Sequence, residues 1–251
     1  MTPVDYDARA GEYGKTRGLA LDSIASWRDA LAPYLVPAPE LPVVDVGSGG
    51  GHFAFALAEW FAVTVIGVEP SAGMRAVALR ENPHRRVAYV AGRAEELPLE
   101  RGSCAAAWLS TVVHQVRDLQ ACARELERVL RAGAPVLIRS SFPGRHHGIT
   151  LFRFFPAARR VAERFPSIEE VAAAFAPSGR RVERVADVAQ VSAPDLRDFC
   201  NRLRAGRRSD STLVSLTDEE FATGLERAER AAAERAVSEP VIDKLTLLVL
   251  A

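Results

Sequence analysis

The chain has 251 residues, of which 48% are hydrophobic and 25% are charged, a composition typical of a globular protein rather than a disordered one. Lys and Arg together number 32, as do Asp and Glu, so no net charge favours binding to nucleic acid or an anionic membrane. No run approaches the roughly 20 apolar residues of a membrane span, and we expect a cytoplasmic protein. Cys104, Cys122 and Cys200 lie far apart and form no CxxC pair, which indicates neither a disulfide framework nor a zinc site.

The first 40 residues combine a polar stretch with a helical pattern. Tyr6, Tyr13 and Arg17 lie in the polar part, and apolar residues recur at helical spacing from Leu21 onward. Pro37 is expected to stop this helix.

From residue 41, short apolar runs alternate with helical stretches. We expect strands over residues 43–46, 63–68, 87–91, 105–110 and 136–140, and helices over 53–61, 73–81 and 119–131. This alternation predicts a parallel sheet with helices on both faces. Further along, the patterns predict strands over 182–190 and 245–250, and helices over 195–203 and 217–236. Thr217 and Glu220 have the spacing of a capping box at the start of the last helix.

A glycine-rich segment, Asp45-Val46-Gly47-Ser48-Gly49-Gly50-Gly51, joins the first expected strand to a helix. Glycines let backbone N–H groups approach a ligand, and enzymes that use NAD, FAD or S-adenosylmethionine (SAM) share this device. Phe53 near the position of the third dinucleotide-fingerprint glycine, and Asp45 before the first glycine, count against a dinucleotide. Glu69 ends the second strand, where a carboxylate can accept the hydroxyls of a ribose.

From about Tyr6 to Ser141 the chain resembles class I SAM-dependent methyltransferases, especially small-molecule enzymes related to ubiquinone biosynthesis. Four ordered segments carry the resemblance: Val43 to Phe53, Val65 to Ser71, Gly92 to Pro98, and Ser110 to Asp118. The fold that this implies is a Rossmann-like, doubly wound α/β sheet of seven strands, mostly parallel with the last strand antiparallel, plus a helical lid. The implied domains are an N-terminal helical lid (1–40), a SAM-binding core (41–141), substrate-lid insertions with the sixth strand (142–240), and the final core strand (241–251).

The resemblance also implies a set of cofactor-binding residues for SAM, whose product is S-adenosylhomocysteine. They are Asp45, Gly47, Ser48, Gly49 and Gly51 for the methionine part, Glu69 for the ribose, Pro70, Met74, Arg93, Ala94 and Glu95 around the adenine, Ser110 and Thr111 beside the methyl group, and Tyr13 and Arg17 from the N-terminal lid. Two residues depart from the family pattern. Arg93 stands where many members have an Asp that accepts the adenine amino group, and Gln115 stands where many have a second His.

Methyl transfer needs positioning above all, with a base only where a proton must leave. His114 is the candidate general base, and the alternative is that its ring only shapes the pocket. The residues expected to bind the acceptor are Tyr6, His114, Arg139, Phe142, Arg145 and Phe154. An aromatic and basic neighbourhood predicts either an acidic or phosphorylated acceptor with an apolar body, or a lid core with a solvent-exposed basic face. Its members are Arg139, Arg145, Arg153, Phe142, Phe152, Phe154 and Phe155.

Other charged groups are interpreted more simply. We read His146 and His147 as a solvated loop pair and expect no metal site. The Arg-rich stretch from Arg202 to Arg208 is typical of a solvated loop, and Glu226 with Arg230 is typical of an exposed helical pair.

These patterns favour SAM-dependent methylation of a small molecule on O, N or C, in secondary or cofactor metabolism, by a monomer or homodimer that binds neither nucleic acid nor membrane. Two alternatives stay open at this point. One is a SAM-binding protein of this fold with a non-methylating role as a cyclase, regulator or scaffold. The other, less favoured, is an NAD-dependent oxidoreductase.

Overall fold

The computed structural model describes residues 21–35, 40–234 and 237–251. Tyr6, Tyr13 and Arg17 therefore lie outside the described residues, and their roles stay predictions.

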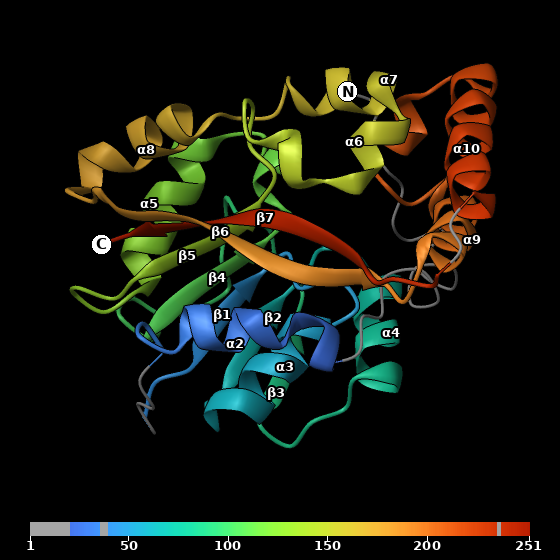
Figure 1. The fold of residues 1–251 in the computed structure, drawn as a ribbon. Coiled ribbons are helices and arrows are strands. Elements are labelled where there is room, and N and C mark those ends of the chain that lie inside the picture. Colours follow the sequence, from blue (N-terminus) through green and yellow to red (C-terminus); the bar gives the residue numbers. More distant parts are fainter. Residues whose placement is uncertain (1–20, 36–39, 235–236) are drawn as a thin grey trace.

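Seven strands form one sheet in the order β3-β2-β1-β4-β5-β7-β6 (Figure 1). They are β1 (Val43–Val46), β2 (Val65–Val68), β3 (Val87–Val90), β4 (Ala106–Ser110), β5 (Val136–Ser140), β6 (Val182–Ala193) and β7 (Val241–Leu250). The first five strands pair in parallel, and β7 runs antiparallel to both β5 and β6. This confirms the doubly wound sheet with an antiparallel last strand. β7 begins four residues earlier than predicted, because Asp243 and Lys244, which look like loop residues, continue the ladder with β6.

One face of the sheet is covered by η1 (Leu21–Ile24), α2 (Ala25–Leu31) and α3 (His52–Phe61). Trp27 from α2 and Leu57 from α3 pack with Trp108 of β4 and Leu137 of β5 in one apolar cluster. In Figure 1, α2 and α3 lie below β4, β5, β6 and β7. The described part of the N-terminal segment is thus packed on the sheet, and we call this side the α2/α3 face.

The opposite face is covered by α5 (Leu119–Val129) and α8 (Ile168–Phe175). Leu126 and Phe175 from these helices pack with Val44 of β1 and Ile138 of β5. The sequence analysis did not predict α8. Its signal is the capping box of Ser167 and Glu170, in which Ser167 Oγ accepts from Glu170 N at 3.2 Å and Glu170 Oε2 accepts from Ser167 N at 2.7 Å.

Four more helices gather beyond one end of the strands, at the right of Figure 1. They are α6 (Thr150–Phe154), α7 (Pro156–Ala162), α9 (Leu196–Gly206) and α10 (Asp218–Ala233), and we call them the lid. The lid has an apolar core of its own, with Phe155, Ala158, Phe199 and Leu203 among its buried members. The predicted capping box starts α10, where Thr217 Oγ1 accepts from Glu220 N at 3.1 Å. The remaining elements are α4 (Ala72–Glu81) and four short turns, η2 (Val113–Gln115), η3 (His146–Gly148), η4 (Ala176–Ser178) and η5 (Leu213–Ser215).

Candidate active site

A cavity of about 740 Å³ lies between the carboxyl ends of β1, β4 and β5 and the lid. One end is lined by the glycine turn and its neighbours: Asp45, Gly47, Ser48, Gly49, His52, Phe53, Ser110, Thr111 and Arg139. The other end is lined mainly by lid side chains: Leu151, Phe152, Phe165, Phe199, Arg202, Leu203 and Leu213. The cavity therefore joins the predicted cofactor turn to an apolar chamber, at the sheet edge where open α/β folds bind ligands.

The glycine turn needs its glycines for both conformation and space. Gly47, Gly49 and Gly51 have φ angles of +69°, +54° and +79°, in the left-handed region that side chains disfavour. A Cβ at Gly47 would lie 2.4 Å from Val112 Cγ2, which is too close. Because the turn leads directly into α3, it forms a backbone cradle at the start of a helix.

Glu69 at the end of β2 is 7% exposed and is held by backbone donors. Its Oε2 accepts from Gly49 N at 2.9 Å, and its Oε1 accepts from Ser71 N at 2.9 Å. A carboxylate has about four lone-pair sites, and ribose hydroxyls are donors of the kind that it accepts. The glycine turn and the predicted ribose carboxylate are thus one connected unit.

Asp45 is 1% exposed, and its Oδ2 has no hydrogen-bond partner among the described residues. Burial, and secondarily the charge of Glu69, raise the pKa of Asp45 to about 8. A buried carboxylate oxygen that lines a cavity without a partner suits a cationic donor from a ligand. The α-amino group of SAM is such a donor, so the residues present fit this cofactor.

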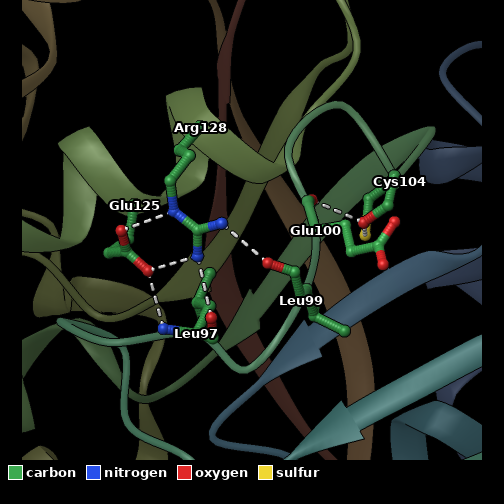
Figure 2. Close-up of polar contacts among 7 residues, drawn as sticks. Leu97, Leu99, Glu100, Cys104, Glu125 and Arg128 are labelled. Atoms are coloured by element: carbon green, nitrogen blue, oxygen red, sulfur yellow. Dashed lines mark hydrogen bonds and ion pairs between the residues drawn. The ribbon is translucent and has the colours of Figure 1, made fainter.

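The loop expected at the adenine edge is clamped from α5, as Figure 2 shows. Arg128 donates from Nη1 to the Leu99 carbonyl at 2.7 Å and from Nη2 to the Leu97 carbonyl at 2.8 Å. Glu125 accepts from Leu97 N at 2.8 Å and also binds Arg128, whose hydrogen bonds hold the pKa of the Glu125 carboxyl below its ordinary value. The loop is therefore positioned by a side-chain pair on a neighbouring helix.

Within this loop, the side chains of Glu95 and Arg93 differ in their contacts. Glu95 Oε1 accepts from Arg117 N at 2.8 Å, which ties the loop to the segment after β4. Ala94 is buried and Arg93 is exposed. The Glu95 carboxylate is thus partly engaged in holding the backbone, while Arg93 extends from the surface.

His114 lies between the core and the lid. Its Nε2 is 3.1 Å from Ser211 Oγ and 3.4 Å from Gln115 Nε2. Its ring stacks on Phe165 with centroids 4.2 Å apart and an interplanar angle of 12°. The structure therefore gives His114 both a packing partner and a polar partner from the lid, at the boundary between the two ends of the cavity.

Arg139 on β5 is 7% exposed and reaches the cavity on the α2/α3 face. It donates from Nη1 to Ser110 Oγ at 3.1 Å and from Nη2 to Gln190 Oε1 at 2.7 Å. Its guanidinium carbon lies 5.2 Å from the ring centroids of both Trp27 and Phe53. The guanidinium is thus held by hydrogen bonds and two aromatic rings.

The structure separates the other members of the predicted basic and aromatic neighbourhood. Phe142 is fully buried in the core beneath α5 and α8, and Phe154 is buried in the lid core. Arg145 donates to Thr246 Oγ1 at 3.0 Å and pairs with Asp187. None of these three lines the described cavity.

Other predicted cofactor residues border the site without lining the described cavity. Met74 is buried, with its backbone N–H capped by Ser71 Oγ at 3.1 Å, and Pro70 is exposed. The aromatic wall of the lid was not predicted as binding residues. Phe165, Phe199 and Leu203 come from distant segments, and their only sequence signal is apolar spacing, which equally indicates a core.

The interpretation of His146 as a solvated loop residue is wrong. Its side chain is fully buried, packs against Phe152 with centroids 4.8 Å apart, and contacts Glu163 Oε1 through Nδ1 at 3.1 Å. Burial lowers the pKa of His146 below its ordinary value, although Glu163 opposes this. His147 is exposed as expected. Of the described Arg202 to Arg208 stretch, Arg202 lines the cavity and Arg207 donates to the lid carbonyls of Leu213 and Leu216.

No described helix is long and apolar enough to cross a membrane. No group of three or more His, Cys, Asp or Glu among the described residues is arranged to hold a metal ion.

Comparisons with known proteins agree with this geometry. Residues 44–138 match a family model described as "Methyltransferase domain". A demethylmenaquinone methyltransferase of Roseiflexus sp. (strain RS-1) is 27% identical over 210 residues, which cover 80% of this chain and 82% of that protein.

Solved structures share the fold. A putative methyltransferase from an antibiotic biosynthesis pathway of Anabaena variabilis aligns with a TM-score of 0.74 and 20% identity, over 92% of this chain and all of that one. The geranyl diphosphate C-methyltransferase of Streptomyces coelicolor A3(2), solved with S-adenosylhomocysteine, aligns with a TM-score of 0.57 and 18% identity, over 90% of this chain and 78% of that one. The cofactor of this site is accordingly SAM, and the oxidoreductase alternative is set aside. Residues 44–138 thus match a methyltransferase domain, and the chain has the fold of class I SAM-dependent methyltransferases.

Proposed function

We propose that this enzyme methylates a small acceptor with a mostly apolar body, bound in the lid chamber beside the cofactor. The observation that carries this proposal is the continuity of one cavity from the glycine turn to Phe152, Phe165 and Phe199. An apolar or aromatic molecule buries its surface well against such rings. SAM supplies an electrophilic methyl group, and the protein's contribution is to place an acceptor atom in line with it.

Arg202 supplies a cationic group for an acidic part of the acceptor. It lies on α9, lines the chamber, and makes no ion pair within the described part of the chain. An anionic substituent would gain a charge-assisted hydrogen bond there while its apolar body packs on Phe199 and Leu203. We therefore infer that the acidic end of the acceptor lies at the lid, away from β5.

His114 is proposed to accept the proton of a hydroxyl or amine acceptor, with Ser211 setting its ring orientation. The Ser211 hydroxyl contacts Nε2 at 3.1 Å, and the Phe165 stack restricts ring rotation. A base placed in this way acts only on acceptors that lose a proton in the reaction. His114 would otherwise serve as a wall between the cofactor and the lid.

The proposal is tested with methyl-labelled SAM and a panel of acceptors that includes a demethylated naphthoquinone supplied in its reduced, hydroquinone form, because a relative carries the name demethylmenaquinone methyltransferase. We expect labelled product from an apolar acceptor and a higher KM for acidic acceptors in Arg202→Gln. His114→Gln should lower kcat and flatten its pH profile, whereas Ser211→Ala should shift that profile. Tight SAM binding with no labelled product across the panel would favour the non-methylating alternative.

A further inference from the structure

A polar patch lies in the cavity wall on the last two strands of the sheet. Gln190 of β6 and Asp243 of β7 stand directly opposite each other in the antiparallel register, so they share a face and their Cβ atoms are about 5 Å apart. Gln190 is 7% exposed and Asp243 is 8% exposed, and both line the cavity together with Ser192. We call these three residues the β6/β7 patch.

The Gln190 amide is held in one orientation. Its Oε1 accepts from Trp27 Nε1 at 3.1 Å and from Arg139 Nη2 at 2.7 Å. Indole and guanidinium nitrogens only donate, so the amide oxygen faces them and the NH2 group lies on the other side. Gln190 Nε2 has no hydrogen-bond partner within the described part of the chain. A buried side chain therefore presents unpaired N–H donors at the cavity wall.

Asp243 is the acceptor beside this donor. Its Oδ1 accepts from Thr150 N, at the start of α6, at 2.7 Å, and its Oδ2 accepts from Ser192 Oγ at 2.6 Å. The register of β6 shifts between Val191 and Ala193, and an irregularity of this kind re-aims a side chain such as that of Ser192. A carboxylate has about four lone-pair sites, and the contacts of Asp243 with described residues use two of them.

The chemistry of the β6/β7 patch discriminates between ligand groups. A carboxylate or phosphate would be repelled by the charge of Asp243, and a protonated amine has no lone pair to accept from Gln190. A carbonyl or ether oxygen would accept from Gln190 and leave Asp243 without a donor. A neutral hydroxyl can accept from Gln190 and donate to Asp243, so it uses both groups.

We propose that Gln190 and Asp243 bind a neutral hydroxyl group on the apolar body of the acceptor. The amide donates to the hydroxyl oxygen, and the carboxylate accepts from the O–H group. This inference rests on the proposed function for the presence of an acceptor in the cavity, and it adds that the acceptor carries a hydroxyl. The contact orients the acceptor and involves no covalent step. An acidic group at Arg202 and a hydroxyl at the β6/β7 patch would be held by different walls of the cavity.

Equilibrium dialysis with two ligands of similar size isolates this contact. The first is 2-naphthol, and the second is 2-fluoronaphthalene, in which fluorine replaces the hydroxyl and cannot donate. The protein is saturated with S-adenosylhomocysteine, so no methyl transfer occurs. We expect the wild-type protein to prefer 2-naphthol by about 10- to 100-fold, as one neutral and one charge-assisted hydrogen bond imply.

Two substitutions each remove one partner and keep the local hydrogen bonds. In Gln190→Glu the side chain can still accept from Trp27 and Arg139 but has no NH2 group. In Asp243→Asn the side chain can still accept from Thr150 N but has only one acceptor oxygen. The preference for 2-naphthol should fall by about fivefold or more in each variant. Gln190→Met, which also lacks the donor, is the second variant if Gln190→Glu does not fold, as judged by circular dichroism.

Gln120→Glu and Asp187→Asn are the matched controls. They make the same chemical changes at exposed positions outside the cavity lining, on α5 and on β6. The preference for 2-naphthol should therefore stay at the wild-type value in both.

Equal affinity of the wild-type protein for the two ligands, or an unchanged preference in the folded variants, would overturn the inference. An equal loss of affinity for both ligands would also overturn it, because that result indicates a structural role. A loss of S-adenosylhomocysteine affinity in Gln190→Glu with the preference intact would assign Gln190 to the cofactor instead. Binding of neither ligand to the wild-type protein would overturn the inference together with the apolar chamber. Failure of the proposed function looks different: the preference would be as expected, and yet no acceptor of the panel would be methylated.

Discussion

The two ends of the cavity are built in different ways. The cofactor end includes residues at strand ends, such as Asp45, Ser110 and Arg139, whose places are fixed by sheet register and by hydrogen bonds. The acceptor end consists of lid side chains, such as Phe165 and Phe199, that meet through apolar contacts. We therefore propose that cofactor binding and acceptor selectivity are carried by separate parts of the molecule, so changes at one end should leave the other largely intact.

The most severe test of the cofactor end is Gly47→Ala. The left-handed φ and the 2.4 Å approach to Val112 combine strain with overpacking, so we expect S-adenosylhomocysteine affinity to fall by about 100-fold or more. Gly102→Ala is the control, because Gly102 has φ +66° and open space around its Cβ position. Calorimetry should show an unchanged affinity for this control. Equal affinities in the two variants would show that the turn does not contact the cofactor.

The substitution Asp45→Asn should change cofactor affinity and the free energy of unfolding in opposite directions. Loss of the carboxylate should lower S-adenosylhomocysteine affinity by about tenfold or more. The raised folded-state pKa of Asp45 means that its contribution to stability is present below about pH 4 and is lost as pH rises toward 8.

Because Asn has no proton to lose, the variant should be more stable than the wild type by about 1–3 kcal/mol at pH 8 and similar to it near pH 4. Urea unfolding at the two pH values measures this difference. A variant less stable than the wild type at pH 8 would contradict the buried, unpartnered environment of this carboxylate.

Phe165→Leu tests the acceptor end. Removing the ring that stacks on His114 should raise acceptor KM by about fivefold and leave S-adenosylhomocysteine affinity unchanged. Phe61→Leu, at the end of α3 and outside the cavity lining, is the control. Steady-state kinetics and calorimetry check the two quantities. A matching loss of cofactor affinity would show that the ends are not independent.

The smallest effect is expected at the clamp in Figure 2. Arg128→Ala removes the donors that hold the Leu97 and Leu99 carbonyls, so we expect a loss of about 1–2 kcal/mol in unfolding free energy. Cofactor affinity should fall about threefold, because the loop is less well positioned. Arg124→Ala on the same helix is the control, since Arg124 is 69% exposed and makes only a 3.9 Å contact with Asp118. Equal cofactor affinities in the two variants would show that this loop does not contribute to the cofactor site.

The sequence by itself determined the sheet, the glycine turn and the position of Glu69. These features are local, because a strand pattern, a Gly-rich turn and an acidic strand end follow one another within about 30 residues. It missed α6, α7 and α8. It also missed the first four residues of β7, where polar residues interrupt the apolar pattern on which strand prediction depends.

Only the tertiary structure decided which charged and aromatic residues meet. Phe142, Arg145 and Phe154 lie close to Arg139 in sequence, yet they go to the core, an ion pair and the lid core. Trp27, Phe53 and Gln190, far from it in sequence, surround its guanidinium. The physical reason is that strand alternation and long-range sheet register assign each side chain to a face, and no local pattern records which distant segment covers that face.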